Sequence, residues 1–412
     1  MESPEDESAV RRTGDIINRV RVGGDKALVE LTRKFDSPSI KTVEDLRVSR
    51  QEIEKAHSRL DPAQADVLKL VSKQIASLAR QQMVRFRKMK FKSPLGFVIN
   101  ERYMPFDRIG GYVPGGLASY PSTVLMICIT ARRAGIRDII LATPPRKDGS
   151  VCESILVAAD ICGVGEIIKA GGAQAVAAMA IGTESIRKVD LIAGPGNQYV
   201  TEAKRQLAAS GSVLIDSLAG PTELLIIADE NADALLVAGD LISQAEHGNR
   251  TLCGIASNSK TLLQKVDSLI RGSFDRPRQA QIRESSLFSV LVPSRSMLVE
   301  FAQRFAPEHL EVMLKNPENY EARLTNSGLV LTGNYTPCSS TDYVAGTNHI
   351  LPTGGTARIS SGLGVENFLK RVTSVTASRE SLRRSSATIS TIANMENLPN
   401  HSMAALSRFR SE

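Results

Sequence analysis

The sequence contains no tryptophan, and aromatic residues make up only 4% of its 412 residues. Its lysines and arginines outnumber the acidic residues to give a net charge of +7, but the two signs are interspersed along the chain. Proteins that bind nucleic acids usually gather basic and stacking residues on one face. No basic stripe with interleaved aromatics occurs here, so the composition argues against a nucleic-acid partner.

Long apolar runs are missing as well. No stretch approaches the roughly 20 apolar residues that a membrane-spanning helix needs, so we expect no membrane partner. The N-terminus, Met-Glu-Ser-Pro-Glu-Asp-Glu, is acidic and is not followed by an apolar region, which argues against secretory and transit peptides. The five cysteines are odd in number and never occur as Cys-x-x-Cys. Reduced thiols in a cytoplasmic protein fit this pattern best.

What the sequence does contain is an alternation of short apolar strands, glycine-rich turns and helices. The hydrophobic content of 42% is enough to bury a sizeable core. From Gly96 onward, strands such as 138–142 alternate with helices such as 122–134, and the same alternation resumes at 223–229. This spacing predicts parallel βαβ units covered by helices. The predicted fold is α/β, with two Rossmann-like parallel-sheet halves, an N-terminal helical arm and a C-terminal helical tail.

Three glycine-rich turns interrupt the first half, at 110–116, 171–174 and 194–197. Glycines allow the backbone to approach phosphates closely, and helix N-termini supply free N–H donors. None of the turns matches G-x-G-x-x-G with an acidic residue about 20 positions later, and each could be a tight turn that needs positive φ. Because ligands bind at the carboxyl ends of strands in open α/β sheets, three such turns predict a nucleotide site.

A Gln-x-x-His pair closes the helix predicted over 232–247. Gln244 and His247 would lie on one helical face, where both side chains can converge on one ion. Alternatively, His247 would be an ordinary histidine at the negative end of the helix dipole. Asp342, in a polar loop, and His401, in the tail, would complete a set of two nitrogen and two oxygen ligands. Such a set suits Zn²⁺ or a similar divalent ion.

Glu308 and His309 form an adjacent carboxylate and imidazole in the segment 305–311. At the start of a strand they would point to opposite faces, whereas in a loop beside a cleft both could reach one substrate. Histidine titrates near neutrality and a buried glutamate can be shifted there, so either is a candidate general base. The alternative is a solvated pair in a capped turn.

Taken in order, five motifs closely resemble the histidinol dehydrogenase family. The motifs are Gly-Gly-Tyr-Val-Pro-Gly-Gly at 110–116, Ala-Gly-Pro-Gly-Asn-Gln-Tyr-Val-Thr-Glu-Ala-Lys-Arg at 193–205, Ser-Gln-Ala-Glu-His-Gly at 243–248, Ala-Pro-Glu-His-Leu-Glu at 306–311 and Asn-His-Ile-Leu-Pro-Thr-Gly-Gly-Thr-Ala-Arg at 348–358. The resemblance extends from Gly23 to His401. It implies oxidation of L-histidinol, through L-histidinal, to L-histidine, with two NAD⁺ and a Zn²⁺ site.

The resemblance also implies a role for each matching residue. The expected metal ligands are Gln244, His247, Asp342 and His401. The expected general bases are Glu308 and His309. The expected NAD contacts are Tyr112, Gln174 and Asn197. The expected substrate contacts are Thr222, Gln244, His247, His309, Asp342, His349, Glu396 and His401.

In this interpretation the segments have distinct tasks. They are an N-terminal helical arm at 1–95, an NAD-binding Rossmann-like half at 96–230, a second Rossmann-like half at 231–330, active-site loops at 331–378 and a helical dimerisation tail at 379–412. In the family the tail crosses to a partner subunit, so the resemblance implies a homodimer whose sites are completed by the partner.

Two alternative functions remain at this stage. One is a related NAD-dependent alcohol dehydrogenase that acts on another polar alcohol, and Glu396 and His349 argue against it. The other is a non-catalytic, zinc-stabilised dimer that senses a nucleotide, and the Glu308–His309 pair argues against that. Thr222 stands where the family usually has serine. A cysteine route for the aldehyde step would use Cys338, but Glu308 offers a route through water.

Overall fold

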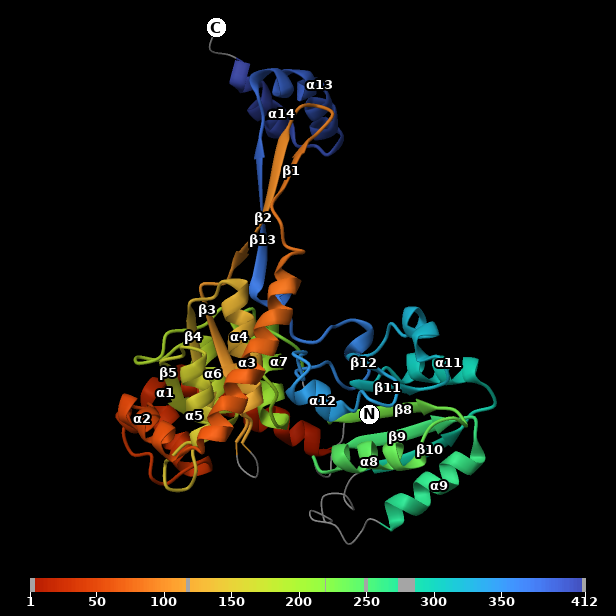
Figure 1. Ribbon diagram of the computed structural model, residues 1–412. Coiled ribbons are helices and arrows are strands. Elements are labelled where there is room, and N and C mark those ends of the chain that lie inside the picture. Colours follow the sequence, from red (N-terminus) through yellow and green to blue (C-terminus); the bar gives the residue numbers. More distant parts are fainter. Residues whose placement is uncertain (1–3, 116–118, 219, 248–250, 273–285, 410–412) are drawn as a thin grey trace. The chain divides into compact units, whose positions relative to one another are not determined.

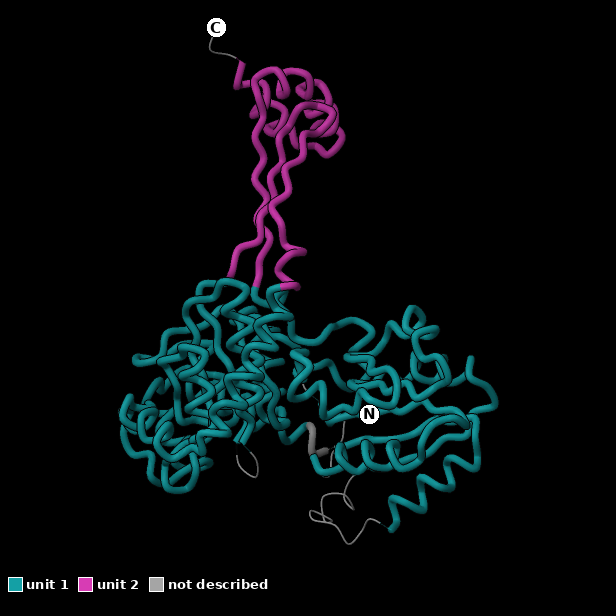
Figure 2. Tube along the Cα trace, viewed as in Figure 1, with its two compact units in different colours: residues 1–80, 106–368 teal, residues 81–105, 369–412 magenta. Residues whose placement is uncertain are grey.

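The computed structural model describes residues 4–115, 119–218, 220–247, 251–272 and 286–409. The chain forms two compact units, which Figure 2 shows in different colours. The first unit comprises residues 1–80 and 106–368, and the second comprises residues 81–105 and 369–412. Both large sheets belong to the first unit.

The first half of that unit is a parallel sheet with the strand order β5-β4-β3-β6-β7 (Figure 1). Its strands are β3 (Arg108–Tyr112), β4 (Asp138–Thr143), β5 (Glu166–Lys169), β6 (Leu191–Ala193) and β7 (Leu214–Ile215). Its connecting helices are α4 (Pro121–Ala134), α5 (Glu153–Ile161), α6 (Gly172–Ile181) and α7 (Gln198–Ala209). The chain starts at the central β3 and winds outward in both directions, so the carboxyl ends of β3 and β6 border a crevice where Rossmann folds bind ligands.

Four helices precede the first sheet in the sequence. They are α1 (Pro4–Phe35), η1 (Glu44–Leu46), α2 (Arg50–Arg59) and α3 (Pro62–Met83). Of these, α1, η1 and α2 pack onto this half. α1 contacts α6 and α7, while α2 contacts α5. Leu28 and Leu31 of α1 share one buried core with Ile140 of β4 and Val176 of α6. The helices predicted at the N-terminus are formed, and α1 contributes to the core of the first half.

The second half repeats the same topology, with the strand order β10-β9-β8-β11-β12 and all strands parallel. Its strands are β8 (Glu223–Ala228), β9 (Leu252–Ser257), β10 (Ser286–Leu291), β11 (His309–Met313) and β12 (Leu329–Thr332). The accompanying helices are α8 (Ala234–Ala245), α9 (Lys260–Arg271), α11 (Arg295–Phe305), η2 (Pro317–Asn319), η3 (Glu321–Arg323), α12 (Cys338–Tyr343), η4 (Thr356–Arg358) and η5 (Val365–Phe368). In both sheets the first strand is central, which confirms the prediction of two Rossmann-like halves.

In the second half, a buried carboxylate joins the segments that follow β8 and β11. Asp229, which follows β8, is fully buried and accepts hydrogen bonds from the backbone N–H groups of Lys315 and Asn231, both at 2.9 Å. Its Oδ2 also lies 2.8 Å from the guanidinium of Arg295. These partners satisfy the buried carboxylate, so Asp229 has a structural role at the carboxyl ends of the second sheet.

The second unit is a small antiparallel sheet with helices. Its strands are β1 (Met89–Lys92), β2 (Val98–Pro105) and β13 (Leu369–Thr376), in the order β1-β2-β13. Its helices are α13 (Arg379–Met395), α14 (Pro399–Leu406) and η6 (Ser407–Phe409). The helical tail was predicted, but β1 and β13 were not, because both lie largely on the surface and β1 is exposed on every residue. Among the described residues, no helix is long and apolar enough to cross a membrane.

Candidate active site

The three residues predicted to contact NAD line one pocket of about 1160 Å³. Tyr112 ends β3, Gln174 lies in the first turn of α6, and Asn197 is the N-cap of α7. The hydroxyl of Tyr112 accepts a hydrogen bond from the backbone N–H of Gly172 (3.0 Å), so two of the glycine-rich turns are fixed to each other. The pocket therefore opens at the carboxyl ends of the first sheet, as expected for a Rossmann-like half.

Asp36 is a pocket residue that the sequence analysis missed. It directly follows α1, and its Oδ2 accepts hydrogen bonds from the backbone N–H of Gly171 (2.9 Å) and from Nε2 of Gln174 (3.0 Å). Burial raises the pKa of Asp36 despite these hydrogen bonds. Five basic side chains also line this pocket, those of Arg12, Arg19, Lys34, Arg146 and Lys147. No local motif marks Asp36, because its role depends on the packing of α1 against the first half.

A second pocket, of about 560 Å³, joins the two halves of the first unit. From the first half it is lined by the β6–α7 turn, including Asn197, which also lines the first pocket. From the second half it is lined by Thr222, which precedes β8, and by His247. The predicted cofactor contact Asn197 thus stands beside two predicted substrate contacts.

The predicted helix containing both Gln244 and His247 is shorter than expected. α8 ends at Ala245, so His247 lies two residues beyond it, in a turn closed by its backbone N–H and the carbonyl of Gln244 (3.2 Å). Gln244 is buried and His247 is exposed. Glu246 keeps a right-handed helical conformation, so one more turn joins Gln244 to His247, and the expectation that their side chains share a face stays a prediction. Gly248, the last residue of the Ser-Gln-Ala-Glu-His-Gly motif, lies outside the described residues.

Glu308 and His309 lie at the amino end of β11 and are both buried, so they are not a solvated pair. Oε2 of Glu308 accepts a hydrogen bond from the backbone N–H of Glu223 (2.9 Å). The Nδ1 atom of His309 lies 3.7 Å from Oε2 of Glu308, and its Nε2 atom lies 3.7 Å from Oδ1 of Asp342. Because Glu308 precedes the strand, its carboxylate is not directed to the opposite face from His309. The imidazole stands between two carboxylates.

The pKa values of these groups follow from burial and mutual charge. Burial raises the pKa of Glu308 to about 7, although the positive charge of His309 opposes that shift. Burial by itself would lower the pKa of His309, but the charges of Glu308 and Asp342 raise it. Burial would raise the pKa of Asp342, but contact with His309 lowers it. Glu308 can therefore accept and release a proton near neutral pH.

The groups around Asp342 indicate whether these residues suit a metal ion. The charges of His309, His349 and His247 all lower the pKa of Asp342, which places three imidazoles within electrostatic reach of one carboxylate. Burial lowers the pKa of His349 to about 4, so this imidazole is neutral at physiological pH. A carboxylate with a lowered pKa among several imidazoles is a kind of donor set that fits Zn²⁺.

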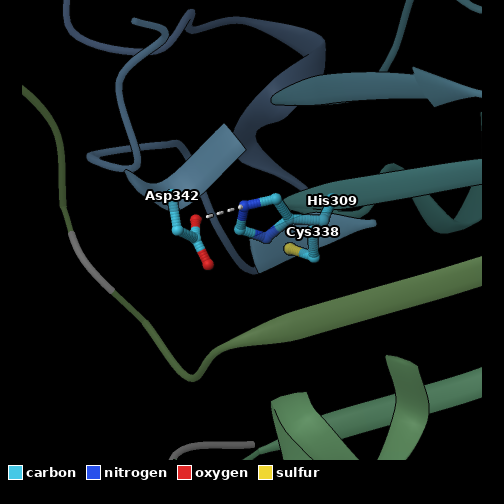
Figure 3. Close-up of side chains that lie close together, drawn as sticks. All are labelled: His309, Cys338 and Asp342. Atoms are coloured by element: carbon cyan, nitrogen blue, oxygen red, sulfur yellow. Dashed lines mark ion pairs between the residues drawn. The ribbon is translucent and has the colours of Figure 1, made fainter. Parts of the chain in front are cut away.

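Among the described residues, His309, Cys338 and Asp342 are the one group of three whose potential ligand atoms lie within 4.8 Å of one another. Figure 3 shows the Asp342 carboxylate facing the His309 imidazole, with the Cys338 thiol close to the same ring. Burial and the neighbouring carboxylates hold the pKa of Cys338 far above its usual range. A thiol that stays protonated is a poor metal ligand and a poor nucleophile, so the nitrogen and oxygen atoms are the useful donors here.

The remaining predicted residues lie in two places. His349 is in the first unit, where its Nε2 atom lies 3.0 Å from Oγ1 of Thr123 on α4. Glu396, at the C-terminal end of α13, and His401, in α14, are exposed residues of the second unit. Their part in the site stays a prediction, as does the complete set of metal, cofactor and substrate contacts.

The chain is similar to known proteins along nearly its whole length. The family model described as histidinol dehydrogenase matches residues 2–409. A histidinol dehydrogenase of Methanothermobacter thermautotrophicus is 42% identical over 400 residues, which cover 96% of this chain and 92% of the relative. A histidinol dehydrogenase of Methanocaldococcus jannaschii is 40% identical over 398 residues, covering 96% and 91%. The crystal structure of histidinol dehydrogenase from Elizabethkingia anophelis has a TM-score of 0.91 at 35% identity, and the match covers 100% of this chain and 93% of that one.

Proposed function

The chain belongs to the histidinol dehydrogenase family, and we propose that it oxidises L-histidinol, through L-histidinal, to L-histidine. In this proposal NAD⁺ binds in the pocket of the first half, and the Glu308–His309 pair of the second half supplies the general bases. The family is one of NAD-dependent oxidoreductases. The relatives named histidinol dehydrogenase match almost the full chain. Their similarity does not favour the two alternatives, a dehydrogenase for another polar alcohol and a non-catalytic zinc dimer.

NAD⁺ fits the pocket that Tyr112, Gln174 and Asn197 line. The pocket lies at the carboxyl ends of a Rossmann-like sheet, and its volume of about 1160 Å³ is large enough for a dinucleotide. Its five basic side chains complement the negative charge of a diphosphate. Bound there, NAD⁺ supplies the acceptor for the hydride in both oxidations.

The metal ligands in this proposal are Gln244, His247, Asp342 and His401 of the partner subunit. A Zn²⁺ ion in this place supplies fixed coordination for the amine and imidazole nitrogens of the substrate. Thr222, His349 and Glu396 would bind the remaining polar groups of the substrate. Holding the alcohol carbon in line with the cofactor orients the two reactants, and such orientation can lower the activation barrier of a reaction by roughly 7–11 kcal/mol.

His309 is the general base of the first oxidation. Its imidazole lies between the carboxylates of Glu308 and Asp342, which stabilise the imidazolium formed when it accepts the hydroxyl proton. Its two ring nitrogens are buried and have no hydrogen-bond partner among the described residues. They are therefore available to a substrate hydroxyl without first breaking a hydrogen bond.

Glu308 is the general base of the second oxidation. This assignment depends chiefly on one observation, a buried carboxylate whose pKa of about 7 lets it take a proton from water near neutral pH. The water then attacks the aldehyde while His309, protonated in the first oxidation, returns its proton to the carbonyl oxygen, which gives the hydrate. His309 accepts a hydroxyl proton of the hydrate again as the hydride passes to the second NAD⁺. The protonated state of Cys338 argues against a thiohemiacetal route.

A homodimer is the remaining part of the proposal. The second unit exposes a set of large apolar side chains that a partner subunit could cover, namely Met89, Phe91, Leu95, Met104, Val375, Ile392, Met395, Leu398, Met403 and Leu406. Burial of such a set is the usual driving force for obligate association. The same unit carries Glu396 and His401, so association would deliver them to a site. We further propose a cytoplasmic location.

The test is the formation of NADH, followed by absorbance, with L-histidinol and with other polar alcohols as substrates. Two NADH per L-histidinol, with little turnover of the other alcohols, is the expected result. Turnover of another alcohol in preference to L-histidinol would support the first alternative, and binding of NAD⁺ without turnover of any alcohol would support the second.

A further inference from the structure

A buried ion pair lies behind the glycine-rich turn at the end of β6. Lys204, on α7, is only 1% exposed, and the side chain of Asp216, which follows β7, is 2% exposed. The Lys204 ammonium and the Asp216 carboxylate form an ion pair. Removing two charges from water is costly, so such a pair persists only where further hydrogen bonds satisfy both groups.

Those further hydrogen bonds all go to one residue of the turn. Nζ of Lys204 donates to the carbonyl oxygen of Gly194 (3.0 Å), and Oδ2 of Asp216 accepts from the backbone N–H of Gly194 (2.8 Å). Both backbone polar groups of Gly194 are thus held by the ion pair. The turn is fixed from behind by two side chains that come from different elements.

Gly194 itself is confined by sterics. Its φ of 126° is unfavourable for residues with a side chain, and a Cβ atom built on it would lie 2.1 Å from the carbonyl oxygen of Tyr112. The turn is therefore pressed against the end of β3, where Tyr112 lines the proposed NAD pocket. A small shift of Gly194 would move the turn relative to Tyr112.

The turn carries a residue that borders both pockets. Asn197, three residues after Gly194, accepts hydrogen bonds from the N–H groups of Tyr199 (3.0 Å) and Val200 (3.2 Å) and so caps α7. It lines the proposed NAD pocket and the second pocket beside Thr222 and His247. The position of Gly194 consequently sets the position of a side chain that faces the cofactor on one side and the substrate on the other.

We propose that Lys204 and Asp216 are positioning residues for the dinucleotide, which hold the Gly194–Asn197 turn in the conformation that binds NAD⁺. The proposal rests on the assignment of the first pocket to NAD⁺. An ion pair that served stability alone would anchor α7 without affecting the cofactor. The two roles differ in what happens to NAD⁺ affinity when the fold is preserved.

The first experiment compares NAD⁺ dissociation constants, measured by calorimetry on the full-length chain, for wild type, Lys204→Met and Arg108→Met. Arg108 is a matched control, because it is another buried cation of the first half and pairs with Asp138 and Glu166 at the amino end of β3. Both variants should lower the midpoint of thermal unfolding. Lys204→Met should weaken NAD⁺ binding about tenfold or more, as expected for a displaced binding turn, and Arg108→Met should leave it unchanged.

A double variant separates the turn from the unpaired charge. Lys204→Met leaves Asp216 buried without its partner, whereas Lys204→Met/Asp216→Leu removes both charges and should recover part of the lost thermal stability. NAD⁺ affinity should stay low in the double variant, because neither side chain then holds Gly194. Recovery of NAD⁺ affinity together with stability, or wild-type affinity in Lys204→Met, would overturn the proposal.

The Michaelis constants distinguish this proposal from the proposed function. Lys204→Met should raise the KM for NAD⁺ more than the KM for L-histidinol, and an equal rise in both would count against a role in holding the dinucleotide. Wild-type protein that binds NAD⁺ without oxidising L-histidinol would contradict the proposed reaction, but the comparison of NAD⁺ affinities would still decide the role of Lys204. Absence of NAD⁺ binding by the wild type would overturn both.

Discussion

Glu223 and Glu308 each donate their backbone N–H to the carboxylate of the other, at 2.9 Å for the bond to Glu308 and 3.3 Å for the bond to Glu223. Glu223 begins β8 and Glu308 directly precedes β11, so this exchange joins the amino ends of two neighbouring strands. Oε2 of Glu223 also accepts the N–H of Gly354 (3.2 Å). The proposed water-activating carboxylate is thus held in place by the backbone N–H of Glu223, and a second buried carboxylate, that of Glu223, holds the backbone of Glu308.

We expect Glu223→Gln to shift the pH dependence of the aldehyde step. The negative charge of Glu223 contributes to the raised pKa of Glu308, after burial, and glutamine keeps the hydrogen-bond acceptor while removing the charge. Glu308 acts as a base in its ionised form, so a lower pKa moves the acidic limb of the profile to lower pH. The measurement is kcat/KM for L-histidinal against pH. Glu300→Gln, on the surface of α11, is the control, and an unshifted limb in Glu223→Gln would contradict the coupling.

Glu308→Gln should separate the two oxidations. Loss of general-base catalysis costs roughly 10²–10⁴-fold, and we expect that loss in the oxidation of L-histidinal, with a much smaller effect on the oxidation of L-histidinol. Single-turnover NADH formation from each substrate measures the two steps separately. Cys338→Ser is the control and should retain both. Equal losses in the two steps of Glu308→Gln, or loss of only the second step in Cys338→Ser, would show that the base was assigned wrongly.

Removal of metal should abolish activity, and added Zn²⁺ should restore it. Asp342→Asn and Gln244→Ala should each bind less Zn²⁺ than wild type, because a neutral amide or a methyl group replaces an oxygen ligand. Zinc content per chain after dialysis, measured by atomic emission, reports this independently of turnover. Glu230→Gln, on the surface after β8, should retain full zinc content. A metal-free preparation with full activity would refute the ligand set.

Mixed dimers test whether a partner subunit completes each site. Glu308→Gln and His401→Asn should each be nearly inactive alone when NADH formation is measured with L-histidinal as the substrate. Random mixing of the two variants gives heterodimers in about half of the population. In each heterodimer one of the two sites has both an intact Glu308 and an intact His401. About a quarter of wild-type activity should therefore return. Co-expression of the two variants followed by the NADH assay measures this. If both residues of a site came from one chain, no activity would return.

Much of the fold could be predicted because it is encoded in local pattern. Alternating strands and helices identified both halves, and the glycine-rich turns lie at the carboxyl ends of the first sheet, beside its large pocket. The Glu308–His309 motif was found as a neighbouring pair of residues. The helix over 232–247 was predicted two residues too long at each end, because Asp233 caps α8 at its start and only a turn follows Ala245.

Other features depended on contacts between residues far apart in the sequence. Local periodicity contains no information about which buried groups will meet, so it could not show that Asp229 binds the backbone of Lys315 or that Asp36 holds Gln174. The sequence by itself determined the kinds of elements and the residues able to carry out the chemistry. Only the tertiary structure decided the protonation and placement of those residues, because burial and the approach of Glu223 to Glu308 and of Lys204 to Gly194 arise when distant segments pack together.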